Sequence, residues 1–168
     1  MKRRSLLQLG LGASVLLALA GAGVSAWRPG WRDGALIEPA REIFGAVARA
    51  VLQGCLPDDP AVQRVALQAH LQRLDASIAG LAPATRRELS DLLAVLNTAA
   101  GRLALAGLGT AWVQASTAEV QQALSDMRLS SSITRQQVYH ALRDLTNAAW
   151  FADAGNWAFV GYPGPQAV

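Results

Sequence analysis

Apolar side chains recur at helical spacing along most of this chain, beginning in its first third. Between residues 39 and 55, the positions that share one helix face are apolar: Ile43, Phe44, Val47 and Val51. Between residues 61 and 79 and just beyond, apolar residues follow steps of four and three: Leu67, Leu71, Leu74, Ile78 and Leu81. The intervening Leu56-Pro57-Asp58-Asp59-Pro60 is typical of a turn. The pattern predicts two helices joined by this turn, with the acidic pair at the start of the second.

A third helix is predicted to open at Thr85, where Thr85 and Glu88 have the spacing of a capping box. Its inner face carries leucines, and Gly101 or Gly107 is expected to end it; these leucines are Leu89, Leu92, Leu93, Leu96 and Leu103.

Two further helices follow. Ser116 and Glu119 repeat the capping-box spacing before a short stripe, Val120, Leu124 and Met127. Residues 134–151 then carry a stripe that consists of Val138, Leu142, Leu145 and Ala149. No segment alternates as a strand for long. We therefore predict an all-α fold: a small bundle of about five helices over residues 27–149, followed by a non-helical C-terminal tail over residues 150–168.

The first 26 residues have the parts of an export signal. Lys2, Arg3 and Arg4 precede an uncharged stretch that ends in small residues, with Ala26 as the expected last residue before cleavage. The Arg3-Arg4 pair before Ser5 resembles the signal of the twin-arginine translocase, which carries folded proteins. Two alternatives stay open: an uncleaved membrane anchor, and an ordinary signal for export in the unfolded state. In each case the body is expected outside the cytoplasm, in the periplasm.

Charge changes the picture once the signal is set aside. The whole chain has 15 basic and 12 acidic residues, and Lys2, Arg3 and Arg4 account for the excess. The remaining body of about 142 residues is therefore neutral and large enough for one domain with a real core. Without excess charge or a basic stripe, nucleic acid is not expected as a partner.

Candidate chemistry in the body is sparse. Cys55 is the only cysteine, so this chain alone is not expected to hold a disulfide, an iron–sulfur cluster or a c-type haem; we expect Cys55 to be a small buried residue. His70 lies at the edge of its helix stripe and His140 points away from its own. No metal-ligand spacing is present. We predict no catalytic, cofactor-binding or metal-binding residues, and no enzyme activity of this chain by itself.

Aromatic residues are concentrated near the C-terminus. Half of the ten Phe, Trp and Tyr residues fall within residues 150–162, ahead of prolines that exclude a helix at 163–165. Four aromatic side chains bury about 600–1,000 Å², comparable to about 800 Å² on one side of a standard interface. This tail is expected either to fold over its own bundle or to dock on another chain. The residues predicted for a partner interface are Trp157, Phe159, Gly161, Tyr162, Pro163, Gly164 and Pro165.

The ending Asn156-Trp157-Ala158-Phe159-Val160-Gly161-Tyr162-Pro163-Gly164-Pro165 resembles the terminal motif of the gluconate 2-dehydrogenase subunit 3 family. The twin-arginine-like leader, the Leu56-Pro57-Asp58 turn and Trp150-Phe151-Ala152-Asp153 occur in the order seen in that family. Only the leader and the ending are specific, because the middle is generic amphipathic helix.

The resemblance implies a non-catalytic accessory subunit of a membrane-associated periplasmic dehydrogenase. In that family the large subunit is an FAD-dependent flavoprotein of the glucose–methanol–choline type, and a multihaem cytochrome c subunit can take its electrons. The small subunit supplies the export signal, escorts the folded flavoprotein and stays bound to it. The alternative is a stand-alone periplasmic helical protein, ligand-binding or membrane-anchored, with a small apolar ligand between its helices.

Overall fold

The structure is a computed structural model in which residues 28–165 are described. The predicted export signal, with Arg3, Arg4 and Ala26, lies outside the described residues. The elements are, in chain order, β1 (Trp31–Arg32), β2 (Ala35–Leu36), α2 (Glu38–Val51), α3 (Pro60–Ala79), α4 (Pro83–Asn97), α5 (Ala99–Ala106), α6 (Thr117–Arg128), α7 (Ile133–Phe151) and the 3-10 helix η3 (Ala154–Val160).

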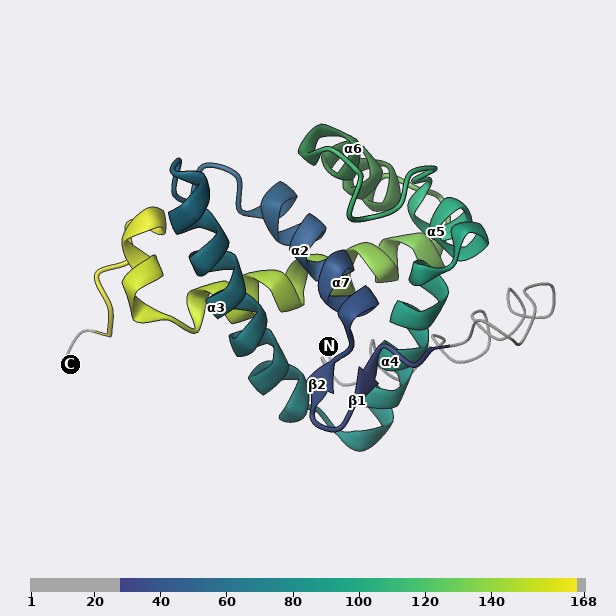
Figure 1. The fold of residues 1–168 in the computed structure, drawn as a ribbon, viewed down its shortest axis with the longest axis horizontal. Helices are drawn as coiled ribbons and strands as arrows, with labels where there is room; N and C mark the ends of the chain where they lie inside the picture. Colours follow the sequence, from purple (N-terminus) through teal and green to yellow (C-terminus); the bar gives the residue numbers. More distant parts are fainter. Residues whose placement is uncertain (1–27, 166–168) are drawn as a thin grey trace.

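Helix α2 lies at the centre of the bundle and packs against α3, α4, α6 and α7 (Figure 1). Its Ile43, Phe44 and Val47 are fully buried, as the stripe predicted. Helix α7 crosses behind α2 and contacts both α3 and α6. Buried side chains from α2, α3, α4, α6 and α7 form one core, so the prediction of a mostly helical bundle is confirmed.

A short β-hairpin precedes the helices and was not predicted. Asp33 and Gly34 both have positive φ, 54° and 84°, which is the backbone of the two-residue Asp-Gly turn that joins twisted antiparallel strands. Asp75 of α3 fixes the hairpin to the bundle: its carboxylate accepts hydrogen bonds from the Leu36 amide at 2.9 Å and from Arg41 Nη1 at 2.7 Å.

Helix α3 matches its prediction closely. Asp59 is its N-cap, and the carboxylate accepts hydrogen bonds from the amides of Ala61 and Val62. Leu74 and Ile78 are fully buried. The acidic pair in the turn therefore includes the helix cap, as expected.

The predicted third helix is wrong in two respects. It begins at Pro83 with no side-chain cap, so Thr85 and Glu88 do not form a capping box; proline is favoured in the first turn, where its missing N–H costs nothing. It also divides at Thr98, whose extended backbone ends α4 and whose hydroxyl caps α5 by accepting from the Gly101 amide. The direction of the chain changes there, and Leu103 is 59% exposed.

The second capping box is confirmed at the start of α6. The Glu119 amide donates to Ser116 Oγ at 3.2 Å, and the Ser116 amide donates to Glu119 Oε2 at 2.8 Å. Val120 and Met127 are fully buried below it. The sequence therefore predicted both the start and the inner face of this helix.

No single helix within residues 28–165 is long and apolar enough to cross a membrane. Helices α4 and α5 reach that length and composition only when taken together, and they are bent by 104° relative to each other.

Candidate interaction surface at the C-terminal segment

The C-terminal segment, residues 150–165, contains more helix than predicted. Trp150 and Phe151 are the last residues of α7, as the helix predicted over residues 134–151 required. Residues 154–160 form η3, so the prediction of a non-helical tail is wrong over that stretch. Asp153 is the N-cap residue at which helical structure begins again after α7. Its Oδ1 accepts a hydrogen bond from the Gly155 amide at 3.0 Å. Among the described residues of the tail, only those after Val160 and the short link at 152–153 lie outside a helix.

Side chains satisfy the last carbonyl groups of α7. Arg73 Nε of α3 donates to the Ala149 carbonyl at 3.1 Å, and Asn156 Nδ2 donates to that of Trp150 at 2.8 Å. Trp157 Nε1 donates to the Phe151 carbonyl at 2.8 Å. The final carbonyls of a helix have no partner within the helix, so these three donors replace water there. Asn156 and Trp157 thereby attach η3 to the end of α7, and Arg73 attaches α3 to it.

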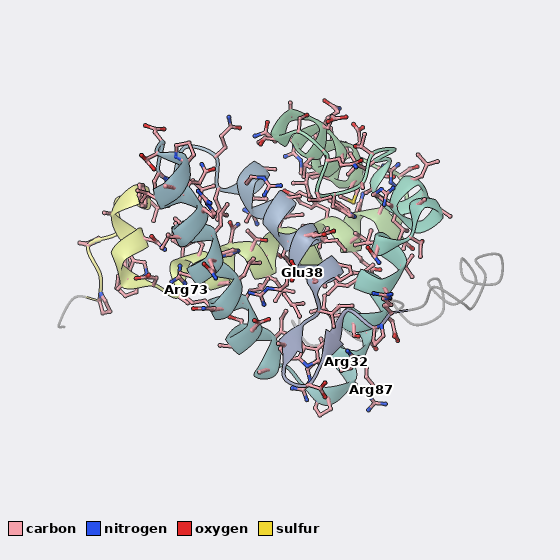
Figure 2. The ribbon with its side chains drawn as sticks, viewed as in Figure 1. Arg32, Glu38, Arg73 and Arg87 are labelled. Carbon is pink, nitrogen blue, oxygen red and sulfur yellow. The ribbon has the colours of Figure 1, made fainter. Side chains whose placement is uncertain are left out.

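Arg73 also joins α3 to the cap of η3. Its Nη1 lies 3.1 Å from Asp153 Oδ2, in an ion pair whose side chains are 26% and 45% exposed. Figure 2 shows Arg73 on α3 beside the end of α7. One guanidinium thus contacts both the end of α7 and the start of η3. The planar guanidinium group has several donors in fixed positions and suits this double contact better than the ammonium group of a lysine would.

Trp157 organises the residues that follow η3. The Tyr162 ring lies 5.3 Å from the Trp157 ring, and the Tyr162 amide donates to the Trp157 carbonyl at 3.1 Å. Gly164 is buried with φ of 94°, and a Cβ there would meet Trp157 at 3.5 Å. Of the predicted interface residues, Trp157 and Gly164 therefore serve mainly to hold the segment in shape.

The remaining predicted interface residues lie at the surface. Phe159 is 55% exposed and Tyr162 is 49% exposed. Gly161, Pro163 and Pro165 are exposed as well. Val160, 59% exposed, belongs to the same surface and was missed, although it stands between two of the predicted positions. We call the side chains of Phe159, Val160 and Tyr162 the C-terminal apolar surface.

Buried polar groups lie beneath this segment. His70 of α3 is fully buried with its ring 6.0 Å from that of Trp150, and neither imidazole nitrogen has a hydrogen-bond partner among the described residues. Trp150 Nε1 is also buried without one. Burial, and secondarily the charge of Arg73, lowers the pKa of His70 to about 4. His70 is therefore neutral at pH 7 and lies in the core, deeper than the edge position that the stripe indicated.

The other candidate residues are separated from one another. His140 is exposed, and its Nδ1 lies 3.7 Å from Asp144. Cys55 is a free thiol, partly buried against a cluster formed by Ala48, Leu52 and Trp150. Within residues 28–165, no three His, Cys, Asp or Glu side chains are grouped so that they could hold a metal ion.

Comparison of the sequence with protein-family models gives no match, and comparisons with curated proteins and with solved structures give none either. Function is therefore inferred from the residues of the chain itself.

Proposed function

We propose that this chain is the non-catalytic small subunit of a periplasmic, membrane-associated FAD-dependent dehydrogenase of the glucose–methanol–choline type. In this proposal it carries the twin-arginine signal, escorts the folded flavoprotein subunit across the membrane and stabilises it afterwards. The flavoprotein oxidises a sugar, sugar acid or alcohol and holds the FAD; haem c, where present, belongs to a cytochrome subunit.

The C-terminal apolar surface is the observation that carries the proposal. Phe159, Val160 and Tyr162 expose large apolar side chains, yet the segment that bears them is fixed by side-chain hydrogen bonds to α7 and by packing around Trp157. Binding orders flexible side chains at a cost, and a segment that is ordered beforehand avoids much of it. Exposed aromatic residues on a fixed scaffold are typical of interface hot spots. Phe159, Val160 and Tyr162 also belong to the ending that resembles the terminal motif of the gluconate 2-dehydrogenase subunit 3 family.

The alternative proposal is a stand-alone periplasmic protein that binds a small apolar ligand or is anchored in the membrane. It needs an enclosed apolar cavity between helices. A hollow of about 660 Å³ between α2 and α3 is open to solvent and bordered by charged side chains, among them Glu38, Glu42 and Arg49, which does not suit a small apolar molecule.

Purification from the periplasm tests the proposal. A C-terminally tagged form of the full chain, expressed in its own host, should bring with it one large protein and the absorbance spectrum of flavin. The mature chain expressed alone should be helical by circular dichroism and should bind no flavin, haem or iron–sulfur group. A stoichiometric chromophore on the isolated chain, or a tagged chain purified from the periplasm without any flavoprotein, would contradict the proposal.

A further inference from the structure

Arg102 is a buried arginine without a counter-ion among the described residues. It lies on the inner face of α5, where Ala106, one turn further along, belongs to the core, and only 8% of the residue is exposed. Its Nε is buried without a hydrogen-bond partner, and its guanidinium takes part in no ion pair within residues 28–165. Arginine is rarely buried to this extent unless a partner balances its charge. The charge of Arg102 therefore needs a partner from beyond the described residues.

The rest of the chain does not supply this counter-ion. Residues 1–27 and 166–168 contain no Asp or Glu, so the C-terminal carboxylate of Val168 is the only acidic group there. It follows the described chain by three residues, which span about 11 Å at most. In Figure 1 the described chain ends after η3, at the left of the long axis, whereas α5 lies at the right. The partner of Arg102 therefore comes from another molecule.

The terminal nitrogens of Arg102 are the part of its side chain that another molecule can reach. Unlike Nε, Nη1 and Nη2 are not fully buried, and neither has a hydrogen-bond partner among the described residues. An arginine whose stem packs on a core normally keeps its head in water, whereas Arg102 as a whole is almost covered. The guanidinium therefore presents a small accessible edge, with N–H donors in fixed positions, from a largely buried site.

The bend between α4 and α5 fixes the backbone that carries Arg102. The Thr98 hydroxyl caps α5 by accepting from the Gly101 amide, and the Thr98 carbonyl accepts from the Arg102 amide at 2.9 Å. Gly101 allows the close contact of the two helices, because a Cβ there would collide with the Val95 carbonyl oxygen. A side chain on a fixed backbone loses less freedom when it binds a ligand. The position of Arg102 thus favours binding.

We propose that Arg102 is the centre of an anion-binding site on α5 that takes a carboxylate group. The two oxygens of a carboxylate match the donors of a guanidinium in a bidentate pair. Its single negative charge balances that of Arg102, whereas a phosphate dianion would bring excess negative charge to a largely buried position. The carboxylate belongs either to a small molecule or to a side chain of the flavoprotein. The site itself does not depend on the proposed function.

An NMR titration of the purified chain with sodium acetate tests the site, at an ionic strength kept constant with sodium chloride. The Nε–H resonance of Arg102 and the amide resonances of Gly101 and Leu103, its neighbours in the chain, should shift and saturate with a millimolar dissociation constant. The matched control is the Nε–H resonance of Arg87, an exposed arginine of α4 labelled in Figure 2, which should not saturate. Sodium phosphate should bind more weakly than acetate.

Two variants separate the charge of Arg102 from its packing. Arg102→Lys keeps the charge but loses the paired donors, so acetate should bind about tenfold more weakly. Arg102→Met keeps an unbranched apolar stem and removes the charge, so the amide resonances of Gly101 and Leu103 should no longer saturate. The helix content and melting temperature of Arg102→Met should stay at least as high as those of the wild type, because an unpaired buried charge does not stabilise the fold.

Absence of saturation at Arg102 in the wild type overturns the proposal, and this result needs no variant to fold. Equal saturation in Arg102→Met places the anion elsewhere and overturns it as well, and tighter binding of phosphate than of acetate contradicts a carboxylate ligand. Where acetate binds as expected, affinity for the purified flavoprotein identifies the source. A loss in Arg102→Met but not in Arg87→Met assigns the carboxylate to the flavoprotein, and unchanged affinity assigns it to a small molecule. If the wild-type chain does not bind the flavoprotein, the proposed function falls and the acetate site stands.

Discussion

His70 is the residue whose environment is most demanding. It is buried at the contact of α3 with α7, with no hydrogen-bond partner for either ring nitrogen among the described residues. Burial disfavours the charged form of the His70 imidazole relative to the neutral form, and the positive charge of the nearby Arg73 disfavours it further. The core beneath the C-terminal segment therefore depends on His70 remaining unprotonated.

The stability of the body should fall as the pH drops from about 6.5 toward 4, the pKa of folded His70. The pKa of His70 is lower in the folded chain than in the unfolded chain, so between these two values the unfolded chain binds a proton at His70 that the folded chain does not. The contribution of neutral His70 to folding stability is therefore complete above pH 6.5 and lost below pH 4. The loss is about 3 kcal/mol.

Urea unfolding of the wild type and of His70→Phe between pH 4 and 7.5 measures this loss. The variant should lack this part of the pH dependence, since phenylalanine cannot be protonated, while the carboxylates titrate in both proteins. Parallel curves for the two proteins would show that His70 is not responsible.

The burial of individual side chains could be predicted where the apolar positions along a helix followed a regular period. Leu92, Leu93 and Leu96 are buried as predicted, because the second half of α4 packs against the core. Leu103 is exposed because the chain turns at Thr98, and a stripe extrapolated across a bend points to the wrong side. Phe159 and Tyr162 were predicted as interface residues from the cluster of aromatic residues and from the resemblance of the ending to a family motif. The roles of Arg73 and Asn156 depend on contacts with the end of α7 that no local pattern indicates.

At the scale of elements, the capping box at the start of α6 is the sequence motif whose effect on stability can be tested most clearly. Ser116→Ala removes the acceptor for the Glu119 amide and should cost about 1 kcal/mol of unfolding free energy. In the wild type, hydrogen bonds from Ser116 lower the pKa of Glu119, so this substitution should also raise that pKa. Urea unfolding and an NMR pH titration measure the two effects. Ser131→Ala, at an exposed position between α6 and α7, is the control; equal stability of both variants would contradict the role of the cap.

The elements that were missed are short and held by contacts from elsewhere in the chain. The Asp33-Gly34 turn is a strong hairpin signal, but two-residue strands show no alternation to accompany it. Helix η3 is held by donors to α7 carbonyls, which become available only where α7 ends. Helices of regular period, α2, α3, α6 and α7, were predicted within a few residues except at the end of α2.

At the scale of the whole molecule, the leader and the body are expected to act together. Replacing Arg3 and Arg4 by lysine keeps the charge but removes paired guanidinium recognition, so this chain and the flavoprotein should both remain in the cytoplasm. Fractionation followed by immunoblotting of both proteins measures this. A protein exported in the unfolded state serves as the control and should be unaffected by expression of the variant. Normal export of the lysine variant would contradict a twin-arginine signal.

Binding to the flavoprotein through the C-terminal apolar surface is the central claim, and one titration tests it most directly. The dissociation constant is measured for the wild type, for Phe159→Ser with Tyr162→Ser, and for the control Leu129→Ser with Ile133→Ser, whose side chains are 73% and 71% exposed near the α6–α7 turn. At about 2 kcal/mol for each lost anchor, the first pair should weaken binding about a thousandfold with unchanged circular dichroism. The control pair should bind like the wild type. Equal affinity of all three proteins would contradict the claim.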